Sequence, residues 1–250
     1  MKNFTFLEYE KPLLTCMVQA DRPQRIKDLI SLSLPEGAEA FGMQFENLKA
    51  EDRNRETCRD LFSFAQRPVY VTDYRSRENK GKSDETLAAQ LLELAECGAT
   101  LCDVMGDYFD PCPGELTRKE EAVRKQMQLI DALHARGAEV LMSSHVLKFL
   151  PAEQVLEIAL EHQRRGADIC KIVVGAATMA EQIENLRILG LLKEHLQIPF
   201  LFLSGGECRI LRRVGGNLGN CMSLCVHEYD AFATKAQPLL CHMKILRDLM

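Results

Sequence analysis

A Gly-Ala pair stands before a short apolar run at four places in the chain, beginning at Gly37, Gly98, Gly137 and Gly166. Glycine can end a helix in the left-handed conformation before the chain enters a strand. The intervals between the pairs correspond to roughly one or two βα units. The pattern therefore indicates helices that alternate with strands, which is typical of a parallel sheet.

Eight apolar runs have the spacing of strands in such a sheet, and most are continuous, as expected for parallel strands buried on both faces. We expect strands at Leu13–Val18, Ala40–Phe45, Val69–Tyr74, Thr100–Met105, Glu139–Ser144, Ile169–Val174, Phe200–Leu203 and Cys221–Val226. Helices fill the gaps between them. At a length of 250 residues, this order predicts a single (β/α)8 TIM barrel domain spanning residues 1–250.

An open doubly wound sheet is the alternative, but it would need a dinucleotide-binding fingerprint early in the chain, and the sequence has none. Two segments match capping boxes that start helices, Thr117 to Glu120 and Thr178 to Glu181. Pro151 suits the first turn of another helix. A closing helix is expected from Leu239 to Leu249.

Composition excludes several classes of partner. The net charge is −5, and no basic block indicates binding to nucleic acid or to a membrane surface. No apolar run is long enough to span a bilayer. The chain opens without a secretory signal, so we expect a cytoplasmic protein whose ten cysteines are reduced. Cys221 and Cys225 lack a second ligand pair, and no metal site is predicted.

One lysine, Lys171, lies in the middle of the predicted sixth strand. Burial disfavours the charged form of an amine, and a neutral amine attacks carbonyl groups. Lys171 is therefore a candidate for forming a Schiff base with a ketone or aldehyde. The alternative is a lysine at a strand edge whose ammonium group reaches water.

In a TIM barrel the chemistry lies at the carboxyl ends of the strands. His145 ends the fifth strand, next to the strand of Lys171, and histidine exchanges protons near neutral pH. The pair could form an imine and move a proton at the adjacent carbon. Arg75 and Arg212 follow the third and seventh strands and are candidate anion anchors. Many TIM barrels bind a phosphate near the seventh and eighth strands, and Gly205-Gly206 after the seventh strand could form such a phosphate site.

Several separate motifs resemble the type I 3-dehydroquinate dehydratases over nearly the whole chain. The matching pieces are Ser143-Ser144-His145 with Pro151, the run from Gly166 to Ile172, Tyr74-Arg75-Ser76, Ile210-Leu211-Arg212 with Gly215 and Gly219, and Gln237. The resemblance implies a (β/α)8 barrel that needs no metal or organic cofactor. It also implies a small keto-acid substrate and a homodimer.

The resemblance assigns a role to each matching residue. Lys171 would form the imine with the substrate ketone. His145 would remove the neighbouring proton and then protonate the departing hydroxyl group. Arg212 and Gln237 would hold the substrate carboxylate, and Arg75 would contact the ring hydroxyl groups.

The chain departs from the family pattern at several binding positions. The glutamate and arginine of the second strand are replaced by Gly42 and Gln44, of which Gln44 keeps its hydrogen-bonding capacity. The glutamate that orients the histidine aligns with Asn79, or with Glu78 after a shift of one residue. Further replacements occur at Leu203, Gly205 and Ala233, with Thr234 next to the last of these.

Three functions are compatible with this pattern. The first is dehydration of 3-dehydroquinate to 3-dehydroshikimate, which the retained Lys171 and His145 favour. The second is a related Schiff-base lyase or aldolase that acts on another carboxylated or phosphorylated keto compound, which Gly42, Gln44 and Gly205 favour. The third is a non-catalytic barrel that binds a small carboxylate or a partner protein.

Overall fold

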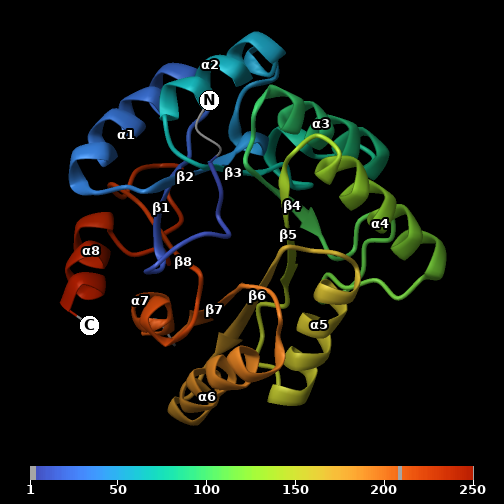
Figure 1. The fold of residues 1–250 in the computed structure, drawn as a ribbon, viewed down its shortest axis with the longest axis vertical. Coiled ribbons are helices and arrows are strands. Elements are labelled where there is room, and N and C mark those ends of the chain that lie inside the picture. Colours follow the sequence, from blue (N-terminus) through green and yellow to red (C-terminus); the bar gives the residue numbers. More distant parts are fainter. Residues whose placement is uncertain (1–3, 208–209, 250) are drawn as a thin grey trace.

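The fold is a nearly closed barrel of parallel strands surrounded by helices (Figure 1). This computed structural model describes residues 4–207 and 210–249. The strands are β1 (Leu13–Val18), β2 (Ala40–Gln44), β3 (Val69–Thr72), β4 (Leu101–Met105), β5 (Glu139–His145), β6 (Ile169–Ala176), β7 (Phe200–Gly206) and β8 (Met222–Cys225). The helices are α1 (Pro23–Glu36), α2 (Arg55–Ala65), α3 (Asp84–Cys97), α4 (Glu120–His134), α5 (Ala152–Arg164), α6 (Met179–His195), α7 (Leu211–Val214) and α8 (Leu240–Leu249).

The strands follow one another around the barrel in sequence order, from β1 to β7, and β8 pairs with β1. The gap between β7 and β8 is bridged by Asn220, whose amide accepts from the Phe202 N–H at 2.8 Å and donates to the Phe202 carbonyl at 3.0 Å. The Cys221 N–H also donates to the Phe200 carbonyl at 2.9 Å. The predicted (β/α)8 TIM barrel is therefore confirmed.

The four glycines that prompted the barrel prediction have left-handed backbones. Their φ angles are 104° at Gly37, 110° at Gly98, 78° at Gly137 and 96° at Gly166. Each lies between the end of a helix and the following strand. A residue with a Cβ atom rarely adopts this conformation, so these turns require glycine.

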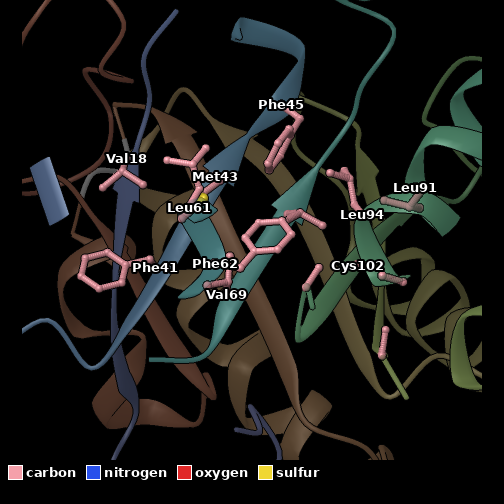
Figure 2. Packing of buried hydrophobic residues seen from close by; sticks show 14 of the residues in the cluster. Val18, Phe41, Met43, Phe45, Leu61, Phe62, Val69, Leu91, Leu94 and Cys102 are labelled. Carbon is pink, nitrogen blue, oxygen red and sulfur yellow. The ribbon is translucent and has the colours of Figure 1, made fainter. Parts of the chain in front are cut away.

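The buried residues form layers inside and outside the barrel. Outside, side chains of β1 to β4 pack against α2 and α3, as Figure 2 shows for Met43, Leu61, Phe62 and Leu94. Inside the barrel lies a separate cluster, many of whose members are close to the amino ends of the strands. It includes Phe6, Ala40, Leu101, Leu141, Ile169, Leu201 and Met222. The interior is a packed core beneath the strand ends rather than a pore.

One of the four predicted helix starts is wrong, and two differ from the structure by one residue. The capping box at Thr178 and Glu181 is confirmed, and it starts α6. The one at Thr117 is wrong, because α4 begins at Glu120 and the Thr117 hydroxyl donates instead to Asp110 at 2.5 Å. Pro151 lies one residue before α5, at its N-cap. The closing helix α8 begins at Leu240.

Among residues 4–207 and 210–249, none of the helices combines the length and the apolar character that a membrane crossing requires. Within the same part of the chain, no group of three or more His, Cys, Asp or Glu side chains could hold a metal ion. Gly205 and Gly206 belong to β7 and pair with Gly175 and Ala176 of β6.

Candidate active site

A cavity of about 220 Å³ lies at the carboxyl ends of the strands. Its wall contains polar side chains from six strands or the loops that follow them. These are Gln44, Tyr70, Thr72, Tyr74, His145, Lys171, Arg212, Thr234 and Gln237. Five of the candidate residues named from the sequence therefore share one cavity: Lys171, His145, Gln44, Arg212 and Gln237.

Lys171 lies in the cavity wall with only 6 % of its side chain exposed. It is held from β6 by three oxygen atoms. Its Nζ donates to the Tyr74 hydroxyl at 2.8 Å, to the Tyr70 hydroxyl at 2.9 Å and to Asp103 Oδ2 at 3.1 Å. The lysine is thus a buried amine with defined direction, not a strand-edge lysine that reaches water.

Asp103 on β4 is the counter-ion of Lys171 and is itself buried. It accepts hydrogen bonds from the hydroxyl groups of Tyr70, of Tyr74 at 2.5 Å and of Ser143 at 2.5 Å. Burial alone would raise the pKa of Asp103, but the Lys171 cation and these hydrogen bonds outweigh it and lower the pKa. The carboxylate therefore stays ionised and balances positive charge on the Lys171 nitrogen.

His145 ends β5, and its Nδ1 lies 2.7 Å from Glu115 Oε2. The same carboxylate oxygen accepts from the His145 backbone N–H at 3.0 Å. A carboxylate on Nδ1 holds that nitrogen protonated and leaves Nε2 for proton exchange with a ligand. Glu115 also stabilises the imidazolium that forms when the ring takes up a proton.

Glu115 lies in the loop between β4 and α4, and the fold holds this loop firmly. Gly106 passes so close that an added Cβ would lie 2.4 Å from the Glu115 carbonyl oxygen. The guanidinium of Arg165 is buried beneath the loop, where it donates to the carbonyls of Gly106 at 3.0 Å and Thr117 at 2.6 Å. Ser144 donates to the Glu115 carbonyl at 2.7 Å.

The opposite end of the cavity is formed by Arg212 and the loop after β8. Burial lowers the pKa of Arg212, and its Nε donates to the Ser204 carbonyl at 3.0 Å. The Gln237 amide is buried, yet its Oε1 meets no hydrogen-bond donor among the described residues. Gln19 fixes this loop through the Thr234 N–H at 2.9 Å. The Arg212 guanidinium supplies donors suited to a carboxylate, and the unpaired Gln237 Oε1 is suited to accept from a ligand hydroxyl group.

The wall between these two ends is partly apolar. It contains Met17, Val173, Leu203 and Leu224, together with Leu147 at the rim. An added Cβ at Gly42 would lie 2.1 Å from the sulfur of Met17, so this methionine fills the space that a larger residue would need. Glu46 is turned away from the cavity wall, where burial raises its pKa to about 7.

Arg75 is not in this cavity wall, contrary to the role predicted for it. It forms a two-pronged ion pair with Asp84 at 2.7 and 2.8 Å, and its Nη1 lies 2.8 Å from Asp107. Side chains alternate across a strand, so the cavity receives Tyr70, Thr72 and Tyr74 from this segment. Arg75 therefore points to the other side and ties the loops after β3 and β4 together.

The prediction that Asn79 or Glu78 orients His145 does not hold, because Glu115 occupies that position. Asn79 is buried elsewhere, where its amide donates to Asp73 at 2.7 Å and accepts from Arg53 at 2.6 Å. Glu78 itself is exposed and lies in the turn Arg77–Asn79.

Three residues around the amine were missed by the sequence analysis: Tyr70, Tyr74 and Asp103. Asp103 carried a usable signal, because a carboxylate in the middle of an apolar strand must find a partner. Tyr70, Thr72 and Tyr74 all face the inside of the barrel. This could have been predicted, because alternate residues of a strand point to the same side. Glu115 lies in an irregular loop and carried no such signal.

Two sequence comparisons with known proteins point to one family. The family model described as type I 3-dehydroquinase matches residues 17–240. A 3-dehydroquinate dehydratase of Syntrophotalea carbinolica is 30% identical over 162 residues, which cover 61% of this chain and 58% of the relative. The matched region thus spans less than two thirds of that relative's length.

Solved structures show the same fold at lower identity. Type I 3-dehydroquinate dehydratase from Clostridium difficile, with covalently modified comenic acid, superposes with a TM-score of 0.80 at 16% identity, covering 97% of this chain and 94% of that one. The enzyme from Geobacillus kaustophilus gives a TM-score of 0.79 at 16% identity, with 96% and 91% covered.

Proposed function

Since the chain belongs to the type I 3-dehydroquinase family, we propose that it dehydrates 3-dehydroquinate to 3-dehydroshikimate through an imine on Lys171. The observation that supports this most is the shared cavity. Lys171, His145 and Arg212 reach it from β6, from β5 and from the helix after β7. A ketone, an adjacent proton and a carboxylate of one small molecule can be contacted there together.

The reaction begins at the buried amine. The Lys171 ammonium gives one proton to the oxygen of the substrate ketone while its nitrogen attacks the carbonyl carbon, and loss of water from this adduct gives a protonated imine. Asp103 lies 3.1 Å from the nitrogen and stabilises this cation as it stabilised the ammonium group. The imine withdraws electrons from the neighbouring carbon, so the proton there becomes easier to remove.

His145 performs the proton transfers. Its Nε2 removes the proton next to the imine, and Glu115 on Nδ1 stabilises the resulting imidazolium. The imidazolium then protonates the hydroxyl group as it leaves. Hydrolysis of the unsaturated imine releases the product and restores Lys171. Arg212 and Gln237 hold the substrate carboxylate throughout.

Turnover of 3-dehydroquinate tests this proposal. Formation of the conjugated enone is followed by its ultraviolet absorbance, with wild-type protein and with His145→Ala. The proposal predicts steady product formation by the wild type and a loss of about 10²- to 10⁴-fold in the variant. A folded wild-type protein without turnover would contradict it.

A second candidate is a Schiff-base lyase for a keto acid with fewer hydroxyl groups. The apolar wall formed by Met17, Val173, Leu203 and Leu224 favours it, as does the outward position of Arg75. Under this alternative, less hydroxylated keto acids form an imine on the wild-type protein that borohydride traps by reduction. 3-Dehydroquinate is not trapped. Trapping of 3-dehydroquinate alone would exclude it.

Two further expectations are proposals of the same kind: a cytoplasmic location, and a homodimer, which the family resemblance implies. Light scattering during size-exclusion chromatography tests the second. A mass of two chains supports the homodimer, and a mass of one chain over the working concentration range contradicts it.

A further inference from the structure

The hydroxyl group of Tyr74 lies at the point where the reacting groups meet. It accepts from Lys171 Nζ at 2.8 Å and donates to Asp103 Oδ2 at 2.5 Å. The Tyr74 ring also lies edge-on to the His145 ring, with centroids 5.4 Å apart and an interplanar angle of 81°. Tyr74 therefore contacts both residues that handle the substrate in the proposed reaction.

Tyr70 shares two of these contacts but has a different position. Its hydroxyl also accepts from Lys171 Nζ, at 2.9 Å, and donates to Asp103. However, Tyr70 lies inside β3, is completely buried and belongs to the hydrophobic cluster inside the barrel. Tyr74 follows β3, is partly exposed and contacts His145. Both tyrosines line the cavity, but Tyr74 is the one that is partly exposed and whose ring contacts His145, so it lies nearer to the carbon at which the hydroxyl group leaves.

Imine formation contains a step that needs proton transfer at this place. Attack of the amine on the ketone gives a carbinolamine whose carbon carries a hydroxyl group and whose nitrogen carries two protons and a positive charge. When water leaves, the carbon–oxygen bond breaks and its electron pair goes to the oxygen. The nitrogen must lose one proton, so that its lone pair forms the C=N bond, and the leaving oxygen must gain one.

We propose that the Tyr74 hydroxyl relays this proton, accepting it from Lys171 Nζ while donating its own proton to the leaving hydroxyl group. The inference rests on the proposed imine at Lys171. The step converts the protonated carbinolamine into a protonated imine and one water molecule. Tyr74 ends the step as a neutral phenol, and no other proton donor is required. The same relay runs in reverse when water attacks the product imine.

The neighbouring groups are less suited to this transfer. Ionised Asp103 only accepts hydrogen bonds. His145 is held by Glu115 for the proton at the adjacent carbon. A phenol both donates and accepts. Burial, and then the charge of Asp103, raises the pKa of Tyr74 well above its usual value, which keeps the hydroxyl protonated. Asp103 retains hydrogen bonds from Tyr70 and Ser143 when Tyr74 turns to the substrate.

The test compares Tyr74→Phe with Tyr70→Phe, a matched control that removes the same kind of hydroxyl from the same lysine and aspartate. Each protein is mixed with 3-dehydroquinate, and separately with pyruvate, and is quenched with borohydride at timed intervals. Mass spectrometry gives the rate at which the adduct on Lys171 forms. The relay predicts a rate about 10²-fold lower in Tyr74→Phe and a loss of less than about 10-fold in Tyr70→Phe.

Carbamoylation of Lys171 by cyanate separates proton relay from positioning of the lysine. Cyanate adds to the amine and no hydroxyl group leaves, so the reaction needs a correctly placed Lys171 but no proton for a departing oxygen. The proposal predicts that Tyr74→Phe keeps the wild-type carbamoylation rate at Lys171. An equal loss in carbamoylation and imine formation would overturn the relay, as would equal losses in the two tyrosine variants.

The two carbonyl probes also separate the relay from the proposed substrate. If the wild type traps pyruvate but not 3-dehydroquinate, the proposed dehydratase activity is wrong, and the relay is then decided on the pyruvate rates. A wild-type protein that traps neither probe overturns both proposals.

Discussion

Lys171 Nζ lies 3.1 Å from Asp103 Oδ2, and the two side chains are only 6 % and 0 % exposed. The lysine comes from β6 and the aspartate from β4, so the pair reaches across the one strand between them, β5, beside Ser143. Each charge is buried with the other as its partner. The same ion pair therefore serves the stability of the barrel and the charge of the proposed imine.

Removal of one partner should cost much of the stability. Lys171→Met leaves the Asp103 carboxylate buried without its cation, and we expect a loss of about 3–5 kcal/mol in the free energy of unfolding. The double variant Lys171→Met, Asp103→Asn carries no unpaired charge and should recover much of this loss. Urea denaturation measures both. A single variant as stable as the wild type would contradict the account of the ion pair.

Glu115 should matter for proton transfer and not for imine formation. Glu115→Gln keeps a hydrogen-bond acceptor at His145 Nδ1 but removes the charge that stabilises imidazolium. We expect kcat to fall by about 10²- to 10⁴-fold, while borohydride still traps the imine at Lys171. Glu78→Gln is the control, because this residue is exposed. A larger loss in the control would return the orienting role to the loop after β3.

The two arginines named from the sequence should behave differently. Arg212→Gln removes a guanidinium from the cavity wall, and we expect kcat/KM to fall by about 10- to 100-fold, mainly through KM. Arg75→Gln breaks the ion pairs with Asp84 and Asp107. It should lower the melting temperature with little change in KM. Steady-state kinetics and thermal denaturation of both variants test this contrast, and the opposite pattern would contradict the placement of Arg75.

His162 should make folding stability dependent on acid pH. Burial, and then the nearby Arg165 cation, lower its pKa from 6.5 to about 3. Below pH 6.5 the unfolded chain binds a proton at this residue that the folded protein does not bind. Its contribution to stability is therefore complete above pH 6.5 and falls by up to about 1.4 kcal/mol per pH unit towards pH 3.

The control for this effect is His162→Gln, which can still bond to Ser144 but does not ionise. The difference in unfolding free energy between wild type and variant should decrease as the pH falls below 6.5. Urea denaturation from pH 7 to pH 4 measures it. Two stability curves that stay parallel over this range would show that His162 is not held neutral in the folded protein.

The barrel could be predicted because its signals are local. A left-handed glycine before an apolar run marks each of four helix-to-strand turns, whatever the rest of the chain does. The start of α4 could not, since Thr117 has the residue type of a capping box but bonds to Asp110 in the preceding loop. Such competition between partners is decided by loop geometry that the sequence pattern does not carry.

The site was predictable where strand position alone fixes a side chain. Lys171 and His145 lie on neighbouring strands, and their inward direction follows from alternation. The predicted substrate contact of Arg75 was wrong because, in the segment after β3, the side chain of Tyr74 takes the inward position. Glu115 could not be predicted from the sequence, because it reaches His145 from a loop whose course depends on Gly106 and on the buried Arg165.

The central claim is a covalent imine at Lys171, and trapping with 3-dehydroquinate and borohydride tests it most directly. The mass of the intact protein is measured by mass spectrometry after reduction, and the modified residue is located by peptide mapping. We predict a single added mass equal to one reduced substrate adduct, located on Lys171. A folded protein that gains no mass, or that carries the adduct on another lysine, would contradict the account.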